Sequence, residues 1–205
     1  MLSRAVLIGD VHTEHVLLAE VLGHAAAARV DRILCVGDIV DGPRDPLACI
    51  DLLRDHDVDV VRGNHERWVN QGNPMEPFDY PPAYRGWLDA LPATRRYATP
   101  RGPLLLGHGT GTDDMVALAP HDEGYALEAM TALWDLVHAD DVRVLVGGHS
   151  HCAMVRQVEH LTVLNPGTLV AHQDPGYLLV DFAAGTVERW LLRPQHARLQ
   201  AWTLR

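Results

Sequence analysis

The sequence contains no lysine. All 17 basic side chains are arginines, and they face 27 Asp and Glu residues, which gives a formal net charge of −10. Proteins that bind nucleic acid non-specifically need an excess of basic side chains to neutralise phosphates, so we do not expect this activity. We attribute the missing lysine to compositional bias rather than to function.

Cysteine, long apolar stretches and a secretion signal are also scarce or missing. The three cysteines, Cys35, Cys49 and Cys152, are an odd number at no metal-ligand spacing, and Cys35 lies in an apolar run that predicts burial. No run of 18 apolar residues is present, so we expect no membrane partner. The first residues lack the charged and apolar regions of a secretory signal, which predicts a cytoplasmic protein. The length suits one domain over residues 1–205.

Apolar runs alternate with helical patterns in the first third of the chain. Runs at 5–8, 33–36 and 58–61 are separated by amphipathic stretches at 14–29 and 46–56. This order indicates βαβ units and a mainly parallel sheet. Further runs at 104–106 and 142–146 enclose one expected helix over 124–139. Short runs over 153–192, separated by strong turns, predict an antiparallel meander that forms or completes a second sheet. We therefore expect an α/β sandwich of two sheets flanked by helices.

Residues 67–92 interrupt this order as an irregular excursion. The segment holds five of the 13 prolines and four ring residues, Trp68, Tyr80, Tyr84 and Trp87, and one short helix is expected near 84–91. The rings could stack a nucleobase, which would make the segment a candidate substrate cap. Packing of an irregular loop against the body of the protein is the commoner reason for such residues.

Metal-capable side chains follow the glycines that end the apolar runs. Ligands of open α/β sheets bind outside the carboxyl ends of the strands, so five strand ends are expected to converge on one locus. In extended backbone, residues two apart point to the same side, so Asp10 with His12 and His149 with His151 could each reach one ion. A single such fragment is typical of a capped turn, but five in succession indicate a metal site. The fragments are Gly9-Asp10-Val11-His12, Gly37-Asp38, Gly63-Asn64-His65, Gly107-His108 and Gly148-His149-Ser150-His151.

The order of these fragments resembles the signature of the calcineurin-like metallophosphoesterase superfamily, in particular its small bacterial phosphodiesterase-like branch. The resemblance runs from Asp10 to His151 and includes the Asn165-Pro166-Gly167 turn that follows the last ligand block in many members. It implies the metallophosphoesterase fold, with two divalent metal ions at the carboxyl ends of the strands. Carboxylate, imidazole and amide ligands suit manganese, with iron, zinc, nickel and cobalt as alternatives.

The resemblance also implies a role for each residue. Asp10, His12, Asp38 and His151 would hold the first ion, and Asp38, Asn64, His108 and His149 the second. A water or hydroxide between the ions would attack phosphorus. His65 matches the general acid, and in extended chain it should point away from Asn64. Asp41 matches the acidic partner that orients this histidine, although a turn residue is the plainer interpretation. Arg62 matches a phosphate contact, although a surface arginine at a strand end explains it equally well.

Two positions depart from the family pattern. Thr13-Glu14 replaces the usual Gly-Asn, which we interpret as a helix start with Thr13 as N-cap, although Glu14 could bring negative charge near phosphate. Gly42 replaces the arginine of the protein-phosphatase branch, and Gly42-Pro43-Arg44-Asp45-Pro46 resembles the phosphodiesterase-like members instead.

The expected function is metal-dependent hydrolysis of a small phosphate ester, with a phosphodiester favoured and a nucleotide as one candidate. The alternatives are a protein serine/threonine-type phosphomonoesterase, a non-catalytic protein-binding scaffold on the same fold, and a binuclear hydrolase of non-phosphate esters or amides. All seven ligand positions and His65 are present, which argues against the scaffold.

Overall fold

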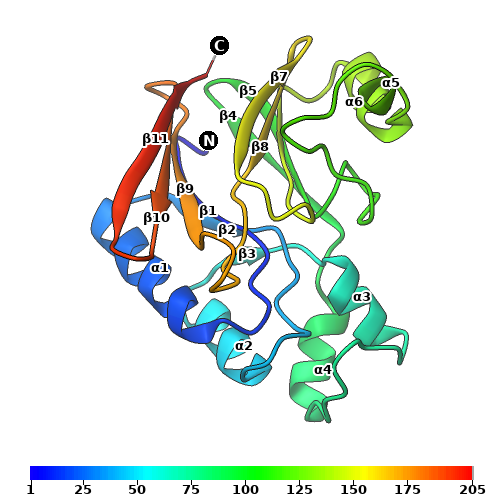
Figure 1. Ribbon diagram of the computed structural model, residues 1–205, viewed down its shortest axis with the longest axis vertical. Helices are drawn as coiled ribbons and strands as arrows, with labels where there is room; N and C mark the ends of the chain where they lie inside the picture. Colours follow the sequence, from blue (N-terminus) through cyan, green and yellow to red (C-terminus); the bar gives the residue numbers. More distant parts are fainter. Residues whose placement is uncertain (205) are drawn as a thin grey trace.

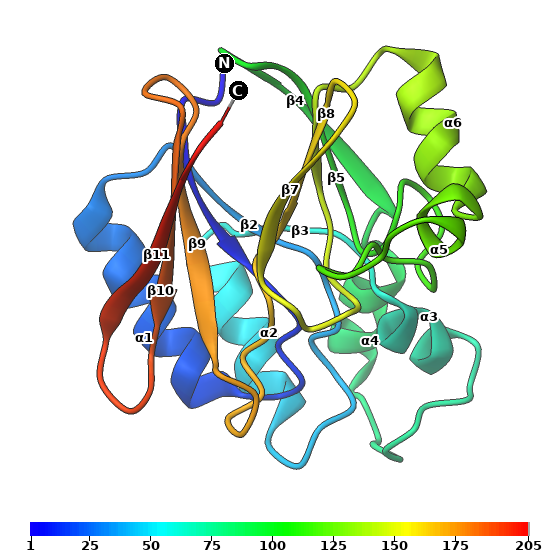
Figure 2. The same ribbon diagram turned by 45° about the horizontal axis from the view of Figure 1, so that its top comes forward.

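The protein is built from two β-sheets that pack face to face, as seen in a computed structural model that describes residues 1–204 (Figures 1 and 2). The first sheet has the strand order β11-β10-β9-β1-β2-β3, and the second has the order β4-β5-β6-β8-β7. Helices cover the outer faces of both sheets. The predicted α/β sandwich of two sheets flanked by helices is therefore confirmed.

The first sheet combines a parallel half with an antiparallel half. Strands β1 (Arg4–Ile8), β2 (Arg32–Cys35) and β3 (Asp59–Val60) are parallel. The helices α1 (His15–Ala28) and α2 (Pro46–Asp55) connect them and lie on the outer face (Figure 2). The antiparallel half consists of β9 (Gly176–Asp181), β10 (Thr186–Leu191) and β11 (Ala197–Thr203).

The second sheet is also mixed. Its parallel centre is β5 (Gly102–Gly107), β6 (Val144–Val146) and β8 (Leu161–Asn165), and the antiparallel edges are β4 (Thr94–Thr99) and β7 (Met154–Val158). The meander predicted for the last part of the chain is thus divided. Strands β7 and β8 belong to the second sheet, whereas β9 to β11 extend the first sheet beside β1.

Three apolar cores result from the two-residue period of the strands. In β1, Ala5 and Leu7 face the second sheet, while Val6 and Ile8 face α1 and α2. In β5, Leu104 and Leu106 fill the space between the sheets, and Leu105 faces the outer helices. Those helices are α5 (Tyr125–Glu128) and α6 (Thr131–Ala139), so the single helix predicted over 124–139 is in fact two.

The excursion predicted for residues 67–92 contains more helix than expected. Helix α3 (Asn64–Asn70) runs into it and α4 (Pro82–Asp89) lies near its end, so residues 71–81 and 90–92 lack a regular element. Tyr80 is buried in the first core, and Tyr84 and Trp87 pack against that core. These three rings therefore serve packing. None of the helices formed by residues 1–204 combines the length and the apolar character that a membrane span needs.

Candidate metal centre

The loops that follow five parallel strands meet at one end of the sandwich. Asp10 follows β1 and Asp38 follows β2, while Asn64 and His65 begin α3 directly after β3. His108 follows β5, and His149 and His151 follow β6. The predicted convergence at the carboxyl ends of the strands therefore exists, and both sheets contribute to it.

Three groups of ligand atoms form within this cluster. In each group one ligand atom per residue lies within 4.8 Å of the others, and the groups are Asp10 with His12 and His151, His12 with Asp38 and His65, and Asp38 with His108 and His149. Asp38 belongs to two of them. The Oδ1 atom of Asn64 lies 2.9 Å from His108 Nε2 and 2.9 Å from His149 Nδ1, so it joins the third group.

The donor atoms of this cluster are better arranged to bind divalent cations than to form hydrogen bonds with one another. Among the described residues, 1–204, Asp10 Oδ2 is buried without any hydrogen-bond partner. The Nε2 atoms of His12 and His151 face each other at 3.2 Å. Buried, uncompensated acceptors of this kind are costly in an empty protein and are the ordinary ligands of a metal ion. Carboxylates, imidazoles and one amide oxygen suit borderline divalent ions.

Carbonyl oxygens orient three of the histidine rings. His108 Nδ1 donates to the Val36 carbonyl at 2.8 Å, His12 Nδ1 to the Asp41 carbonyl at 3.1 Å, and His151 Nδ1 to the Gln173 side-chain oxygen at 2.7 Å. Because a carbonyl only accepts, the proton resides on Nδ1, and Nε2 keeps its lone pair for a metal. Sequence reasoning missed Gln173, since an exposed glutamine beside a turn carries no signal of this role.

Burial and mutual charge shift the ionisation of the buried ligands. Burial raises the pKa of Asp10 above its ordinary value. Burial also opposes the charge of Asp38, but His108, His65 and His12 outweigh it and hold the pKa of Asp38 well below its usual range. For His108, burial lowers the pKa, but Asp38 at 3.2 Å outweighs burial and raises the pKa to about 9. The metal-free centre thus holds a proton that a cation would displace.

His65 lies beside the metal-ligand cluster and contacts two carboxylates. Its Nδ1 donates to Asp41 Oδ2 at 2.9 Å, and its Nε2 lies 3.7 Å from Asp38 Oδ2. The predicted reason for its direction was wrong, because Asn64 and His65 are the first residues of α3 rather than extended chain. Successive helical residues point about 100° apart, which separates the two side chains equally well. The edge of Trp68 lies against the His65 ring, with centroids 4.7 Å apart.

The two histidine-containing pairs spaced two residues apart, Asp10 with His12 and His149 with His151, also differ from the prediction. His12, His149 and His151 have positive φ angles of 43°, 64° and 57°, so neither pair is extended. Asp10 and His12 still share one group, but His149 and His151 belong to different groups. Left-handed backbone turns the second pair apart, so the His-x-His unit contributes to two places rather than one.

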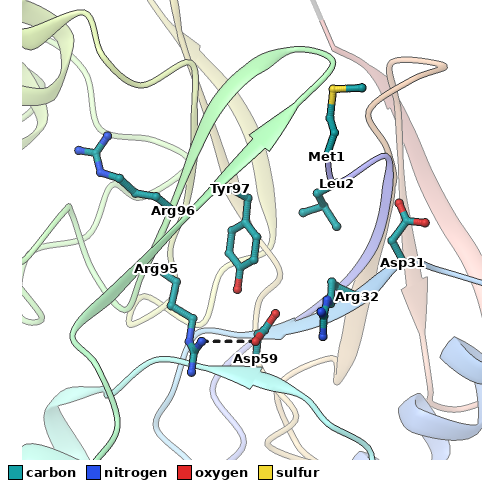
Figure 3. Close-up of a pocket in the computed structure, with 8 residues that line it drawn as sticks. All are labelled: Met1, Leu2, Asp31, Arg32, Asp59, Arg95, Arg96 and Tyr97. Carbon is teal, nitrogen blue, oxygen red and sulfur yellow. Dashed lines mark ion pairs between the residues drawn. The ribbon is translucent and has the colours of Figure 1, made fainter.

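A cavity of about 380 Å³ opens beside these residues. Its lining includes three histidines, His12, His65 and His151, and the apolar residues Pro43, Met75 and Val170. No arginine among residues 1–204 lines it. A larger hollow of about 470 Å³ lies at the opposite, amino ends of β2 and β3 (Figure 3). There Arg95 pairs with Asp59 at 3.5 Å, and the cluster of metal-capable side chains is absent from its lining. The smaller cavity is therefore the candidate site.

Of the remaining candidates from the sequence, Arg62, Thr13 and Glu14, only Glu14 lines the cavity. Arg62 is not part of the cavity lining, and its Nε atom is buried without a hydrogen-bond partner among residues 1–204. Thr13 is not the N-cap of α1, since Glu14 occupies that place; the Thr13 hydroxyl instead accepts the Arg44 N–H at 2.9 Å. Glu14 lines the cavity, but its carboxylate is paired with Arg44, whose Nε atom lies 2.7 Å from Glu14 Oε2.

Gly42 is required by close packing. A Cβ atom at this position would lie 2.1 Å from the His12 carbonyl oxygen and 2.4 Å from Thr13 Oγ1. No side chain fits there without moving the loop that carries His12. The phosphate-gripping arginine of the protein-phosphatase branch is therefore sterically excluded in this backbone.

The fold and the cluster define a two-sheet α/β protein with a candidate centre for divalent metals. Residues 4–185 match the calcineurin-like phosphoesterase superfamily domain, and the chain belongs to this superfamily. This match confirms the resemblance that the sequence motifs showed. The metallophosphoesterases of this superfamily use divalent metals.

Three known proteins illustrate the relationship. An uncharacterized protein of Methanocaldococcus jannaschii, MJ0912, is 25% identical over 203 residues, which cover 89% of this chain and 76% of the relative. The Escherichia coli phosphoesterase Yfce superposes with a TM-score of 0.62 at 19% identity, covering 98% of this chain and all of that one. Zinc-complexed Vps29 of Entamoeba histolytica gives 0.56 at 20% identity, covering 96% and 98%. The two structural likenesses show the shared fold.

Proposed function

We propose that this protein hydrolyses a small phosphate ester, preferably a phosphodiester, with two divalent metal ions held by the clustered side chains. The observation that carries the proposal is the shared carboxylate. Asp38 contributes to two of the ligand groups, as a residue bridging two ions would. We assign Asp10, His12, Asp38 and His151 to one ion and Asp38, Asn64, His108 and His149 to the other, with manganese as the expected metal. Divalent ions in such sites lower the pKa of water and neutralise charge on phosphate oxygens.

We assign the remaining chemistry to His65. The bond to the leaving oxygen breaks as a water oxygen adds to phosphorus, and His65 Nε2 gives its proton to the leaving oxygen. The Asp41 carboxylate, 2.9 Å from Nδ1, supports this role because it fixes the orientation of the ring. Arg62 stays a proposed phosphate contact, supported by its place directly before Gly63 and Asn64 at the end of β3.

The cavity supports a diester over a dianionic monoester. Among residues 1–204 its lining contains no arginine; it includes Glu76, while the charge of Glu14 is paired with Arg44, and its other parts include Pro43, Met75 and Val170. A diester carries one negative charge fewer than a monoester. It also has a second ester substituent, which the apolar residues of the lining can cover. A nucleotide is one candidate substrate, and we expect the protein to act in the cytoplasm.

Turnover of model substrates tests the proposal. Purified protein loaded with Mn²⁺ should hydrolyse bis-p-nitrophenyl phosphate faster than p-nitrophenyl phosphate. Asp38→Asn and His108→Ala should lose both bound metal and turnover, whereas Asp57→Asn, the same change at a side chain that is 95% exposed, should lose neither. Metal-loaded protein that hydrolyses neither compound would contradict the proposal.

The likeness to Vps29 keeps a protein-binding scaffold as the second candidate. Under that function, metal could bind while catalysis is absent, and the same assay separates the two. Retention of every ligand position together with the His65–Asp41 pair supports the enzyme, since a scaffold has no need of a proton donor.

A further inference from the structure

The segment between α3 and α4 reaches back to the proposed acid. Within residues 71–81, the backbone N–H of Met75 donates to Asp41 Oδ2 at 3.1 Å, and the N–H of Glu76 donates to Asp41 Oδ1 at 3.2 Å. No side chain of the segment is needed for either contact. Both contacts are made by backbone groups that any non-proline residue would supply.

The same carboxylate holds His65. The Asp41 side chain is only 1% exposed and accepts three N–H groups, from His65 Nδ1, Met75 and Glu76. A buried carboxylate with both oxygens engaged cannot rotate without breaking these bonds. Loss of the two backbone donors would leave Asp41 tethered by His65 alone and would free the imidazole to turn.

Met75 and Glu76 also line the cavity where the leaving group would lie. Met75 is 66% exposed and belongs to the cavity lining, while its backbone N–H donates to Asp41. The segment that receives the leaving group therefore also touches the group that orients its proton donor.

We propose, on the basis of the proposed phosphoesterase activity, that Met75 and Glu76 are positioning residues for His65. Their backbone N–H groups lock Asp41, and Asp41 locks the imidazole that protonates the leaving oxygen. The segment around them is thus part of the acid machinery of the site rather than only a cover.

Proline variants remove the N–H groups selectively. Met75→Pro and Glu76→Pro each delete one donor, and Met75→Ala and Glu76→Ala are the matched controls that keep it. Diphenyl phosphate needs a proton donor for its leaving group, whereas bis-p-nitrophenyl phosphate releases a stable phenolate. General acid catalysis contributes on the order of 10²–10⁴-fold, so we expect each proline variant to lose about 10-fold or more in kcat on diphenyl phosphate.

The ratio of kcat on the two substrates distinguishes a loss of His65 positioning from a general loss of folded or active protein. The proline variants should lose far less on bis-p-nitrophenyl phosphate, and the alanine variants should keep the wild-type ratio of the two substrates. An unchanged ratio in both proline variants would overturn the proposal.

A measurement without turnover separates this inference from the proposed activity. In proton NMR, the His65 Nδ1 proton should give a slowly exchanging resonance in the wild type and in the alanine variants, absent in His65→Gln and lost in the proline variants. Retention of that resonance in the proline variants overturns the inference even if the protein hydrolyses esters. Should a proline variant fail to fold, amide exchange of the unmodified protein decides. Protected Met75 and Glu76 amides support the inference, and exchange as fast as in exposed loop overturns it.

Discussion

The imidazole of His108 is completely buried and lies 3.2 Å from one carboxylate and 3.8 Å from another. Its pKa of about 9 in the metal-free protein exceeds the ordinary value of 6.5. The stabilisation from its charged form is therefore fully present below about pH 6.5 and is lost as pH rises through about 9.

Metal binding needs the neutral ring, so cation and proton compete for His108. We expect Mn²⁺ affinity to rise with pH between about 6.5 and 9, with proton release on binding. Titration calorimetry in buffers of different ionisation enthalpy measures that release. Affinity that is independent of pH in this interval would argue against His108 as a ligand.

Gly9 and Gly23 give opposite predictions for the same substitution. A Cβ atom on Gly9 would lie 1.7 Å from the Gly167 carbonyl oxygen, so Gly9→Ala should lower the free energy of unfolding by about 1–3 kcal/mol. Gly23 lies in the exposed part of α1, and a Cβ atom added there would meet nothing within 4 Å outside its own stretch of helix. Gly23→Ala should therefore raise the free energy of unfolding by about 0.5–1 kcal/mol. Urea denaturation measures both. Equal effects at the two sites would contradict the close packing of Gly9 on Gly167.

At the residue scale, the sequence predicted which side chains gather but not how each is held. The strand-end glycines and the residues after them bring Asp10, Asp38 and His108 to one place because parallel strands share a carboxyl edge. Left-handed backbone at His149 and His151 has no signature in a His-x-His fragment. The contact between Asp41 and residues 75 and 76 depends on how a proline-rich loop returns to the body, and spacing carries no information about this.

Helix α3 fixes the strand-end loops through one side chain. The carboxylate of Glu66, fully buried, accepts the backbone N–H groups of Asp38, Ile39 and Gly63 at 2.9, 2.7 and 2.8 Å and that of Val40 at 3.2 Å. The loops after β2 and β3 are thereby tied to the first turn of α3. These contacts make Glu66 a support of the two loops and part of the N-terminal cap of α3.

We expect Glu66→Gln to destabilise the protein strongly. An amide NH₂ group would meet two backbone donors in place of an acceptor, at a cost of about 2–4 kcal/mol. The loop that carries Asp38 should loosen, and metal affinity should fall as well. Thermal denaturation and metal titration of Glu66→Gln, compared with Glu128→Gln on exposed α5, measure the effect. A variant as stable as the wild type would show that the two loops hold without this carboxylate.

Strands β4 and β11 are the two that the sequence did not predict. Strand β4 carries two adjacent exposed arginines, Arg95 and Arg96, between the half-buried Thr94 and Tyr97, and β11 is exposed along nearly its whole length. Both lie at sheet edges, where polar side chains suppress pairing with other chains and leave no apolar run to detect. Interior strands such as β1, β5 and β6 are almost continuously apolar and were recognised for that reason. Which sheet each late strand joins depends on long-range pairing that local pattern does not encode.

At the scale of the whole molecule, the metal centre joins the two sheets. Asp10 forms an isolated bridge with Thr168, and the Asn165 amide donates to the Gly148 carbonyl, so the turn after β8 links the last ligand loop to the first. Bound metal should therefore stabilise the entire fold. At a metal concentration of about 100 times Kd, mass action adds about 2.7 kcal/mol to the free energy of unfolding. For a chain of this size the melting temperature should rise by roughly 5–10 °C.

Melting curves with Mn²⁺ and with EDTA measure this shift. Asp38→Asn should abolish it, and Asp57→Asn should preserve it. A shift that survives in Asp38→Asn would place the stabilising ion elsewhere in the molecule.

The pairing of His12 with His151 has a consequence for protein synthesis. The two rings meet at 3.2 Å although 139 positions separate them along the chain. During translation, therefore, the ring of His12 leaves the ribosome long before its counterpart exists. A nascent chain that ends after α3 holds three of the four residues assigned to one ion but only Asp38 and Asn64 of the four assigned to the other. Both ligand sets are therefore complete only after His151, about three quarters of the way along the 205 residues, has emerged.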